Sequence, residues 1–164
     1  RIFKSLQGLN PPLSQQVRLP RLKDMPTGET RPMPLLLRLI AALLAVVYVG
    51  NGLTMLWDPE AWYAAVPGVT ATGPMNPHFI RDIGFAYAAS GAAALAVLLQ
   101  ARNAAIWALV SAVWPGLHAL FHIYNWSHHG MPAGEALTAE IAGVIVPAAL
   151  GLYLAFAARR RAAS

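Results

Sequence analysis

Residues 35–57 decide the class of this protein: they read LLLRLIAALLAVVYVGNGLTMLW, and Arg38 is their only charged residue. A helix of this length rises roughly 33 Å, which is enough to cross the hydrocarbon core of a bilayer. Three further runs of this kind follow along the chain, at 79–100, 104–126 and 137–158. We therefore predict an all-α fold, a bundle of four transmembrane helices that forms a single domain.

The composition agrees with a chain that lies in lipid. Hydrophobic residues make up 57% of the 164 residues and charged residues 12%, whereas a soluble domain carries about 25% charged residues. The formal net charge is +5, and most of the basic residues lie before the first run or after the last. This is the charge bias of a membrane protein, so we expect no nucleic-acid partner. The chain has no cysteine, which excludes disulfides and thiolate metal sites.

The loops predict the orientation of the bundle. The segment 1–34 is strongly basic, Arg102 lies between the second and third runs, and the C-terminus at 159–164 begins with three arginines. Loops 58–78 and 127–136 contain neither lysine nor arginine. Because lysine and arginine are retained on the cytoplasmic side, we expect a multi-pass protein of the bacterial inner membrane with both termini in the cytoplasm.

Proline and glycine mark the connections. Loops 58–78 and 127–136 are rich in both residues and are typical of turns. The connection between the second and third runs is very short, so these runs should form an antiparallel hairpin. Pro115 and Pro147 fall inside the third and fourth runs and predict kinks there.

The N-terminal segment 1–34 is predicted to be a basic, proline-rich cytoplasmic tail. Such a segment buries too little apolar surface to fold alone, so we expect other membrane subunits to order it. The second run is rich in glycine, alanine and serine around Gly84 and Gly91. Small residues let helix backbones approach closely in lipid, and these helix faces are a second predicted docking surface for such subunits.

Polar residues form a stripe along the third run. Trp114, His118, His122, Asn125 and His129 are spaced four, four, three and four residues apart. At 3.6 residues per turn this spacing places them on one helix face. An imidazole facing lipid would leave its nitrogens unsatisfied, so the stripe should face the inside of the bundle.

Further polar residues gather toward the same side of the membrane. The second run begins near His78, Arg81 and Asp82, and the fourth begins near Glu135 and Glu140. Asp82 close to a helix N-terminus suits an interfacial anchor and cap, or the charged wall of a pocket. The candidates for a ligand site or polar network are His78, Arg81, Asp82, His118, His122, Asn125, His129 and Glu140.

Three interpretations of this cluster stay open. It could be a hydrogen-bonded network that fixes helix register, flanked by an interfacial belt of tryptophan and tyrosine. It could be a metal site made by His118, His122 and either Asp82 or Glu140, or a haem site pairing His78 with His118 or His122. It could be a small-molecule or proton site in which histidine and carboxylate titrate.

The segment Gly52-Leu53-Thr54-Met55-Leu56-Trp57-Asp58-Pro59 and the start Arg81-Asp82-Ile83-Gly84 of the second run resemble the DoxX-like group of small bacterial membrane proteins. The resemblance covers roughly residues 35–158 and implies a four-helix membrane fold. Some members of that group are associated with quinone-linked sulfur oxidation. The resemblance assigns no catalytic residue, and it does not extend to the tail or the histidine stripe.

The sequence contains no phosphate-binding loop, no G-x-S-x-G element and no dinucleotide fingerprint. We therefore expect a non-catalytic accessory subunit of a larger respiratory or photosynthetic membrane complex, with bound lipid. One alternative is a redox protein with metal, haem or quinone at His118 and His122. The other is a small transporter or proton-linked binding protein.

Overall fold

The computed structural model describes residues 32–163. The predicted cytoplasmic tail and its docking role fall almost wholly on residues 1–31, which lie outside the described residues. Within 32–163 there is no strand, and the predicted all-α four-helix bundle is confirmed. By length and apolar composition, four helices in this part could each cross a membrane: α1 (Leu35–Trp57), α3 (Pro77–Leu99), α4 (Ala104–His129) and the composite helix Gly134–Ala162.

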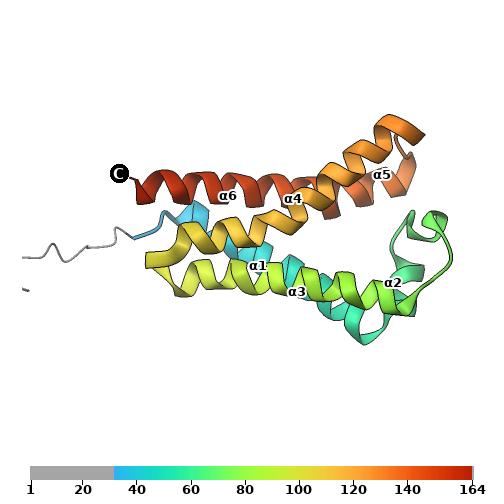
Figure 1. Ribbon diagram of the computed structural model, residues 1–164, viewed down its shortest axis with the longest axis horizontal. Helices are drawn as coiled ribbons and strands as arrows, with labels where there is room; N and C mark the ends of the chain where they lie inside the picture. Colours follow the sequence, from blue (N-terminus) through green and yellow to red (C-terminus); the bar gives the residue numbers. More distant parts are fainter. Residues whose placement is uncertain (1–31, 164) are drawn as a thin grey trace, which may run out of the picture. The chain divides into compact units, whose positions relative to one another are not determined.

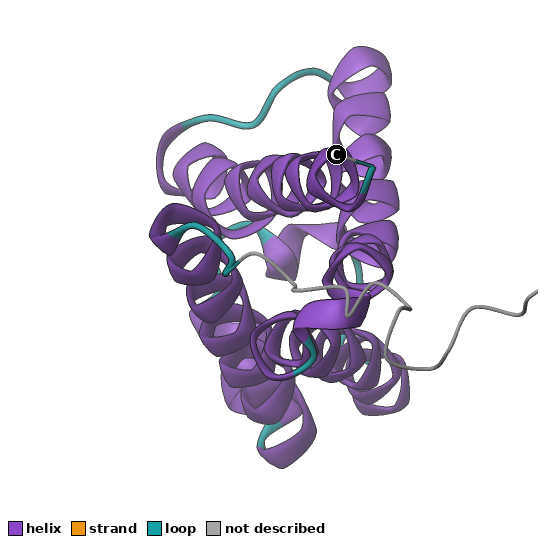
Figure 2. Ribbon diagram, turned by 90° about the vertical axis from the view of Figure 1, so that its left-hand side faces the viewer, coloured by secondary structure: helices purple, strands orange, loops and turns teal. Residues whose placement is uncertain are grey.

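The four long helices form a ring in which each packs against two neighbours (Figures 1 and 2). α1 packs mainly on α3, α4 packs on α6 (Val146–Ala162), and the ring closes through α3 with α4 and α1 with α6. Arg161 Nη2 donates to the carbonyl oxygen of Pro32 at 3.0 Å, which joins the end of α6 to the start of α1. We call this end, which also holds the α3–α4 connection, the tail end, and the opposite end the loop end.

Close backbone approach holds α1 against α3. A Cβ added at Gly52 would lie 2.7 Å from the carbonyl oxygen of Gly84, and one added at Gly91 would lie 2.6 Å from Cγ2 of Val49. Only glycine therefore fits these crossings. Much of the small-residue face of α3 is thus used inside this chain, which leaves exposed residues such as Ala89 and Ala92 for the predicted docking of other subunits.

The connection between α1 and α3 contains helical structure that the sequence analysis missed. Instead of turns alone, residues 58–78 include α2 (Pro59–Ala65) and a 3₁₀ turn, η3 (Val69–Thr72). Asp58 starts α2 by accepting a hydrogen bond from the backbone N–H of Ala61 at 2.9 Å, and Pro59 occupies the first helical position. An aspartate cap followed by proline is a helix-start signal. Trp62 then ties α2 to α1 by donating from Nε1 to Oδ1 of Asn51 at 2.9 Å.

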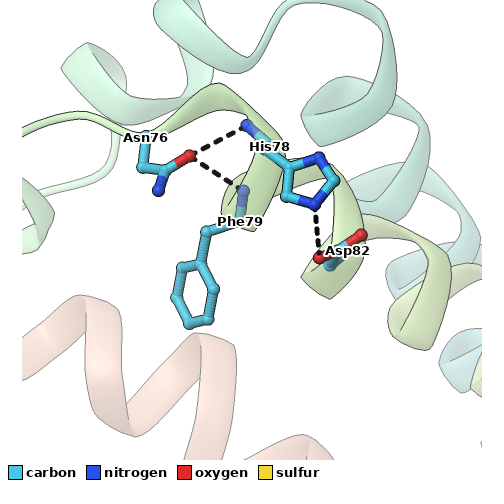
Figure 3. Close-up of polar contacts among 4 residues, drawn as sticks. All are labelled: Asn76, His78, Phe79 and Asp82. Atoms are coloured by element: carbon cyan, nitrogen blue, oxygen red, sulfur yellow. Dashed lines mark hydrogen bonds and ion pairs between the residues drawn. The ribbon is translucent and has the colours of Figure 1, made fainter.

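α3 begins at Pro77, two residues earlier than predicted. The side-chain oxygen of Asn76 accepts hydrogen bonds from the backbone N–H groups of His78 and Phe79, at 3.1 and 3.2 Å (Figure 3). These are two of the donors that the first turn of a helix leaves unpaired. The predicted cap at this end, Asp82, is therefore replaced by Asn76.

α4 ends at His129, three residues later than predicted, and Gly130 terminates it with a φ of 87°. The backbone conformation at Gly130 is one that side chains disfavour, so glycine suits this helix end. The predicted loop 127–136 is consequently shortened, because its first residues belong to α4 and its last to α5 (Gly134–Glu140).

The fourth span is longer and less regular than predicted. It consists of α5, a π-helical turn, η5 (Ile141–Ile145), and α6. The π turn ends two positions before Pro147, whose ring nitrogen carries no hydrogen for the α-helical ladder. At the other end, the arginines of the predicted separate C-terminus, 159–164, lie in the last turn of α6, where positive charge is favoured by the helix dipole.

Candidate functional site

The polar stripe of α4 turns toward the bundle over most of its length. Trp114, His118, His122 and Asn125 are half-buried, whereas His129 at the end of the helix is exposed. Apolar residues occupy the outward face of the same turns, with Leu117, Leu120 and Phe121 exposed. The stripe is therefore an inner face of the bundle except at its last turn.

Aromatic rings connect this stripe to the buried centre. Tyr48 of α1 and Tyr87 of α3 have ring centroids 5.9 Å apart, and Tyr87 meets the Trp114 ring edge-on at 4.7 Å. Trp114 stacks on His118 with a centroid separation of 4.9 Å and an interplanar angle of 13°. His118 in turn meets His122 edge-on at 4.7 Å. A continuous row of rings thus runs from α1 through α3 to the histidines of α4.

Glu140 ends this row with a carboxylate. Its Oε2 lies 2.9 Å from Nδ1 of His122 and accepts a hydrogen bond from Nε1 of Trp126 at 2.6 Å. The side chains of His122 and Glu140 are 21% and 24% exposed, so the pair is largely withdrawn from the surface. Hydrogen bonds to a charged carboxylate are among the stronger ones in proteins. His122, Trp126 and Glu140 together form what we call the carboxylate site.

The fold explains why Glu140 reaches α4. It is the last residue of α5 and precedes the π turn η5, both of which lie in the span that packs along α4. His122 and Trp126 are four residues apart on α4, so both project from the same face toward Glu140. The π turn widens the helix directly after Glu140, where the carboxylate must face inward. π turns of this kind are frequent at functional sites.

The three candidates at the start of α3 lie apart from the carboxylate site. His78 Nε2 lies 3.6 Å from Oδ2 of Asp82, and these side chains are 89% and 61% exposed (Figure 3). Asp82 follows the buried Ile80 by two residues, which places it about 200° around the helix from the inward face. The pair is therefore a surface contact at the loop end.

Arg81 makes a hydrogen bond that joins two helices, and it does not face the carboxylate site. Its Nε donates to the carbonyl oxygen of Leu56 at 3.4 Å, near the C-terminus of α1. The last carbonyls of a helix lack partners within the helix, and a cation near them is favoured by the helix dipole. Arg81 thus joins the end of α1 to the start of α3.

The predicted metal set of His118, His122 and Asp82 is not brought together. Across the described residues, no three side chains of histidine, aspartate or glutamate gather closely enough to hold a metal ion. Asp82 contacts His78 instead, while His122 contacts Glu140. For the haem variant, His78 is almost fully exposed at the first turn of α3, where it contacts Asp82.

Three aromatic residues of this region were not predicted to belong to it: Tyr48 and Tyr87 of the row, and Trp126 of the carboxylate site. Trp126 was assigned only to an interfacial belt, although its position four residues after His122 places it on the same stripe. Tyr48 lies in an apolar run, and no polar pattern in the sequence singles it out. Within residues 32–163 its buried hydroxyl has no hydrogen-bond partner. Its position beside Tyr87 depends on helix packing and could not be read from the sequence.

No family model matches this chain, and neither the curated proteins nor the solved structures compared with it show a match. The resemblance to the DoxX-like group therefore stays an expectation from its short motifs.

Proposed function

We propose that this chain is a proton-linked binding protein of the membrane, of the small-transporter class, with its proton site at His122 and Glu140. The observation that carries the proposal is the 2.9 Å contact between these two half-buried side chains. Both belong to helices long and apolar enough to cross a membrane. Ionisable residues at such positions are expensive and usually take part in ion or substrate pathways.

An imidazole beside a carboxylate gives the site three charge states. A neutral imidazole beside an ionised carboxylate makes the pair negative, one added proton makes it neutral overall, and a second makes it positive. Histidine is the side chain that most readily changes charge near physiological pH. A bound ligand whose charge matches one of these states would therefore be linked to proton uptake or release, and this coupling is reciprocal.

The position of the site along the helix suits such coupling. Glu140 lies six residues after Gly134, the start of its helix, which corresponds to about 9 Å of helical rise. The carboxylate is therefore inside the span and not in the connecting loop. Trp114 stacks on His118, and Trp126 bonds to Glu140, so two large aromatic side chains border the histidines.

The charge distribution supports an orientation with the tail end in the cytoplasm of a bacterial inner membrane. The arginines of residues 32–163 at the tail end are Arg38, Arg102, Arg159, Arg160 and Arg161, and the loop end has Arg81. The positive-inside rule favours cytoplasmic retention of the arginine-rich end. In this orientation the carboxylate site lies in the outer half of the membrane.

Histidine-selective NMR of the full chain in lipid nanodiscs tests the proton site. We expect the ring nitrogens of His122 to report protonation as the pH falls, and Glu140→Gln to change that titration. Glu135→Gln is the matched control, since Glu135 lies on the same short helix but is exposed. Identical His122 titrations in wild type and Glu140→Gln would refute a shared proton.

Tryptophan fluorescence then tests ligand coupling. Small organic cations, organic anions and short-chain quinones would be screened against the wild type at an acidic and an alkaline pH, because Trp126 bonds directly to Glu140. We expect at least one class to bind with an affinity that depends on pH in wild type and Glu135→Gln, but not in Glu140→Gln. Binding that is independent of pH in every variant would contradict proton linkage.

The accessory-subunit function stays a prediction. Its main support, the proline-rich tail, lies outside the described residues, and the small-residue face of α3 is largely occupied by α1. Co-purification of other subunits in mild detergent would support it.

A further inference from the structure

The connection between α1 and α3 reaches across the loop end and touches the fourth span. We call residues 66–73 of this connection the strap; they follow α2 and include η3 (Figure 1). A Cβ added at Gly68 of the strap would lie 3.0 Å from Cβ of Ala136 in α5. Both residues are half-buried, whereas residues 70–73 of the strap are exposed. The strap therefore rests on α5 through a glycine, which leaves no room there for a side chain.

This contact lies directly outside the carboxylate site. Ala136 precedes Glu140 by four residues in the same helix, so the two share one helix face and are separated by about 6 Å of helical rise. The face is the one that presents Glu140 to His122. A path that enters the bundle from the loop end along this face therefore passes Gly68 before it reaches the carboxylate.

The strap is tied firmly on one side and loosely on the other. The hydroxyl of Tyr63 in α2 donates to the carbonyl oxygen of Gly73 at 2.5 Å, and Trp62 fixes α2 to Asn51 of α1. Among residues 32–163, no hydrogen bond joins the strap to α5; its own bonds run to α2 and within the strap. The strap can therefore move away from α5 without breaking a hydrogen bond between them.

We propose that the strap is a gate over the loop-end entrance to the carboxylate site, closed in this structure by the contact of Gly68 with Ala136. The inference rests on the proton-linked function proposed above, because it concerns how a ligand or proton reaches His122 and Glu140. Separation of the contact exposes the face of α5 one turn outside the carboxylate, and its return shields the pair from water. Loops that close over polar sites exclude water in this way and strengthen the electrostatic interactions inside.

A reversible cross-link tests the gate. The chain contains no cysteine, so the double variant Gly68→Cys/Ala136→Cys has thiols only at the contact. The 3.0 Å between the two Cβ positions needs a small shift to reach the roughly 3.8 Å usual in a disulfide. Deuterium exchange of the Trp126 indole hydrogen, followed by NMR in lipid nanodiscs, reports access, because this hydrogen is bonded to Glu140. The oxidised form should exchange roughly tenfold more slowly than the reduced form of the same protein.

A second variant should act in the opposite direction. Ala136→Leu adds volume where Gly68 leaves none, so it should hold the strap away from α5 and accelerate exchange at Trp126. The matched control is Thr138→Leu, which places leucine at an exposed position of the same short helix and should exchange like wild type. The indole hydrogen of Trp107, bonded to Gln100 at the tail end, is the internal reference and should not change in any variant.

The outcomes separate the gate from the function on which it rests. Equal exchange at Trp126 in the oxidised and reduced forms would overturn the gate, as would an unchanged rate in Ala136→Leu. Equal acceleration at Trp107 would mean general loosening of the bundle and would also overturn it. These rates are measured at a single pH, so they decide the gate even if ligand binding proves independent of pH and the proton linkage is wrong.

Discussion

Oε2 of Glu140 lies 2.9 Å from Nδ1 of His122, although 18 positions separate the two residues in the chain. The contact fastens the beginning of the fourth span to the end of α4 at the loop end. Trp126 adds a second hydrogen bond to the same oxygen at 2.6 Å. One carboxylate therefore organises both the local packing and the proposed proton chemistry.

Replacing Glu140 with alanine should destabilise the bundle by about 1–3 kcal/mol, since it leaves the half-buried donors of His122 and Trp126 without their acceptor. Glu135→Ala, on the exposed side of the same helix, should stay within about 0.5 kcal/mol of wild type. Denaturant unfolding in detergent, followed by circular dichroism, measures both. Equal stability of the two variants would mean that the contact contributes nothing to the fold.

Gly52→Ala should destabilise the α1–α3 pair by about 1–3 kcal/mol, the usual range for overpacking a tight contact. The new Cβ would lie 2.7 Å from the carbonyl oxygen of Gly84 and 2.9 Å from the backbone nitrogen of Ala88. Gly50→Ala is the control, because a Cβ there meets nothing within 4 Å. Thermal unfolding should separate the two variants, and a neutral Gly52→Ala would contradict the close helix crossing.

Asn76→Ala should cost about 0.5–2 kcal/mol, as expected for loss of a helix N-cap. The side chain of Asn76 accepts two backbone hydrogen bonds in the first turn of α3. Asn103 precedes α4 in the same way but makes no side-chain cap bond, so Asn103→Ala provides the comparison. Hydrogen exchange of the amides of His78 and Phe79 should accelerate only in Asn76→Ala. Unchanged exchange there would argue against the cap.

Tyr48→Phe should leave stability unchanged or raise it slightly. The hydroxyl of Tyr48 is buried without a partner in the described structure, and removing an unsatisfied polar group avoids its desolvation cost. Tyr48→Ala should instead cost about 3–5 kcal/mol, as for other large aromatic residues of a core. A marked loss of stability in Tyr48→Phe would reveal a partner for this hydroxyl, such as a bound ligand or water.

The helix ends show how far local sequence signals reach. The first span was predicted at both ends as observed, Leu35–Trp57, because an apolar run is bounded there by proline and by Asp58. The start of α3 was placed two residues late because Asn76 and Pro77 were treated as loop residues and not as a cap. α2 was missed for the same reason, although Asp58 and Pro59 carry the signal in the sequence.

The candidate site was predicted only in part. The spacing of His118 and His122 identified the inner face of α4, since residues four apart on a helix share a face. Spacing could not decide whether Asp82 or Glu140 meets these histidines. That choice depends on the rotation of α3 and of the fourth span about their own axes, and one residue corresponds to about 100° of rotation. The structure turns Asp82 to the surface and Glu140 toward His122.

The sequence by itself determined that four helices form and that they are apolar enough to cross a membrane. A helix satisfies its own backbone hydrogen bonds, so run length and side-chain polarity suffice to predict it. Tertiary structure alone decided that Glu140 bonds to His122 and Trp126 and that Gly52 of α1 lies against Gly84 of α3. Each of these arrangements brings together residues of two different helices. It depends on the packing of side chains that lie far apart in the chain.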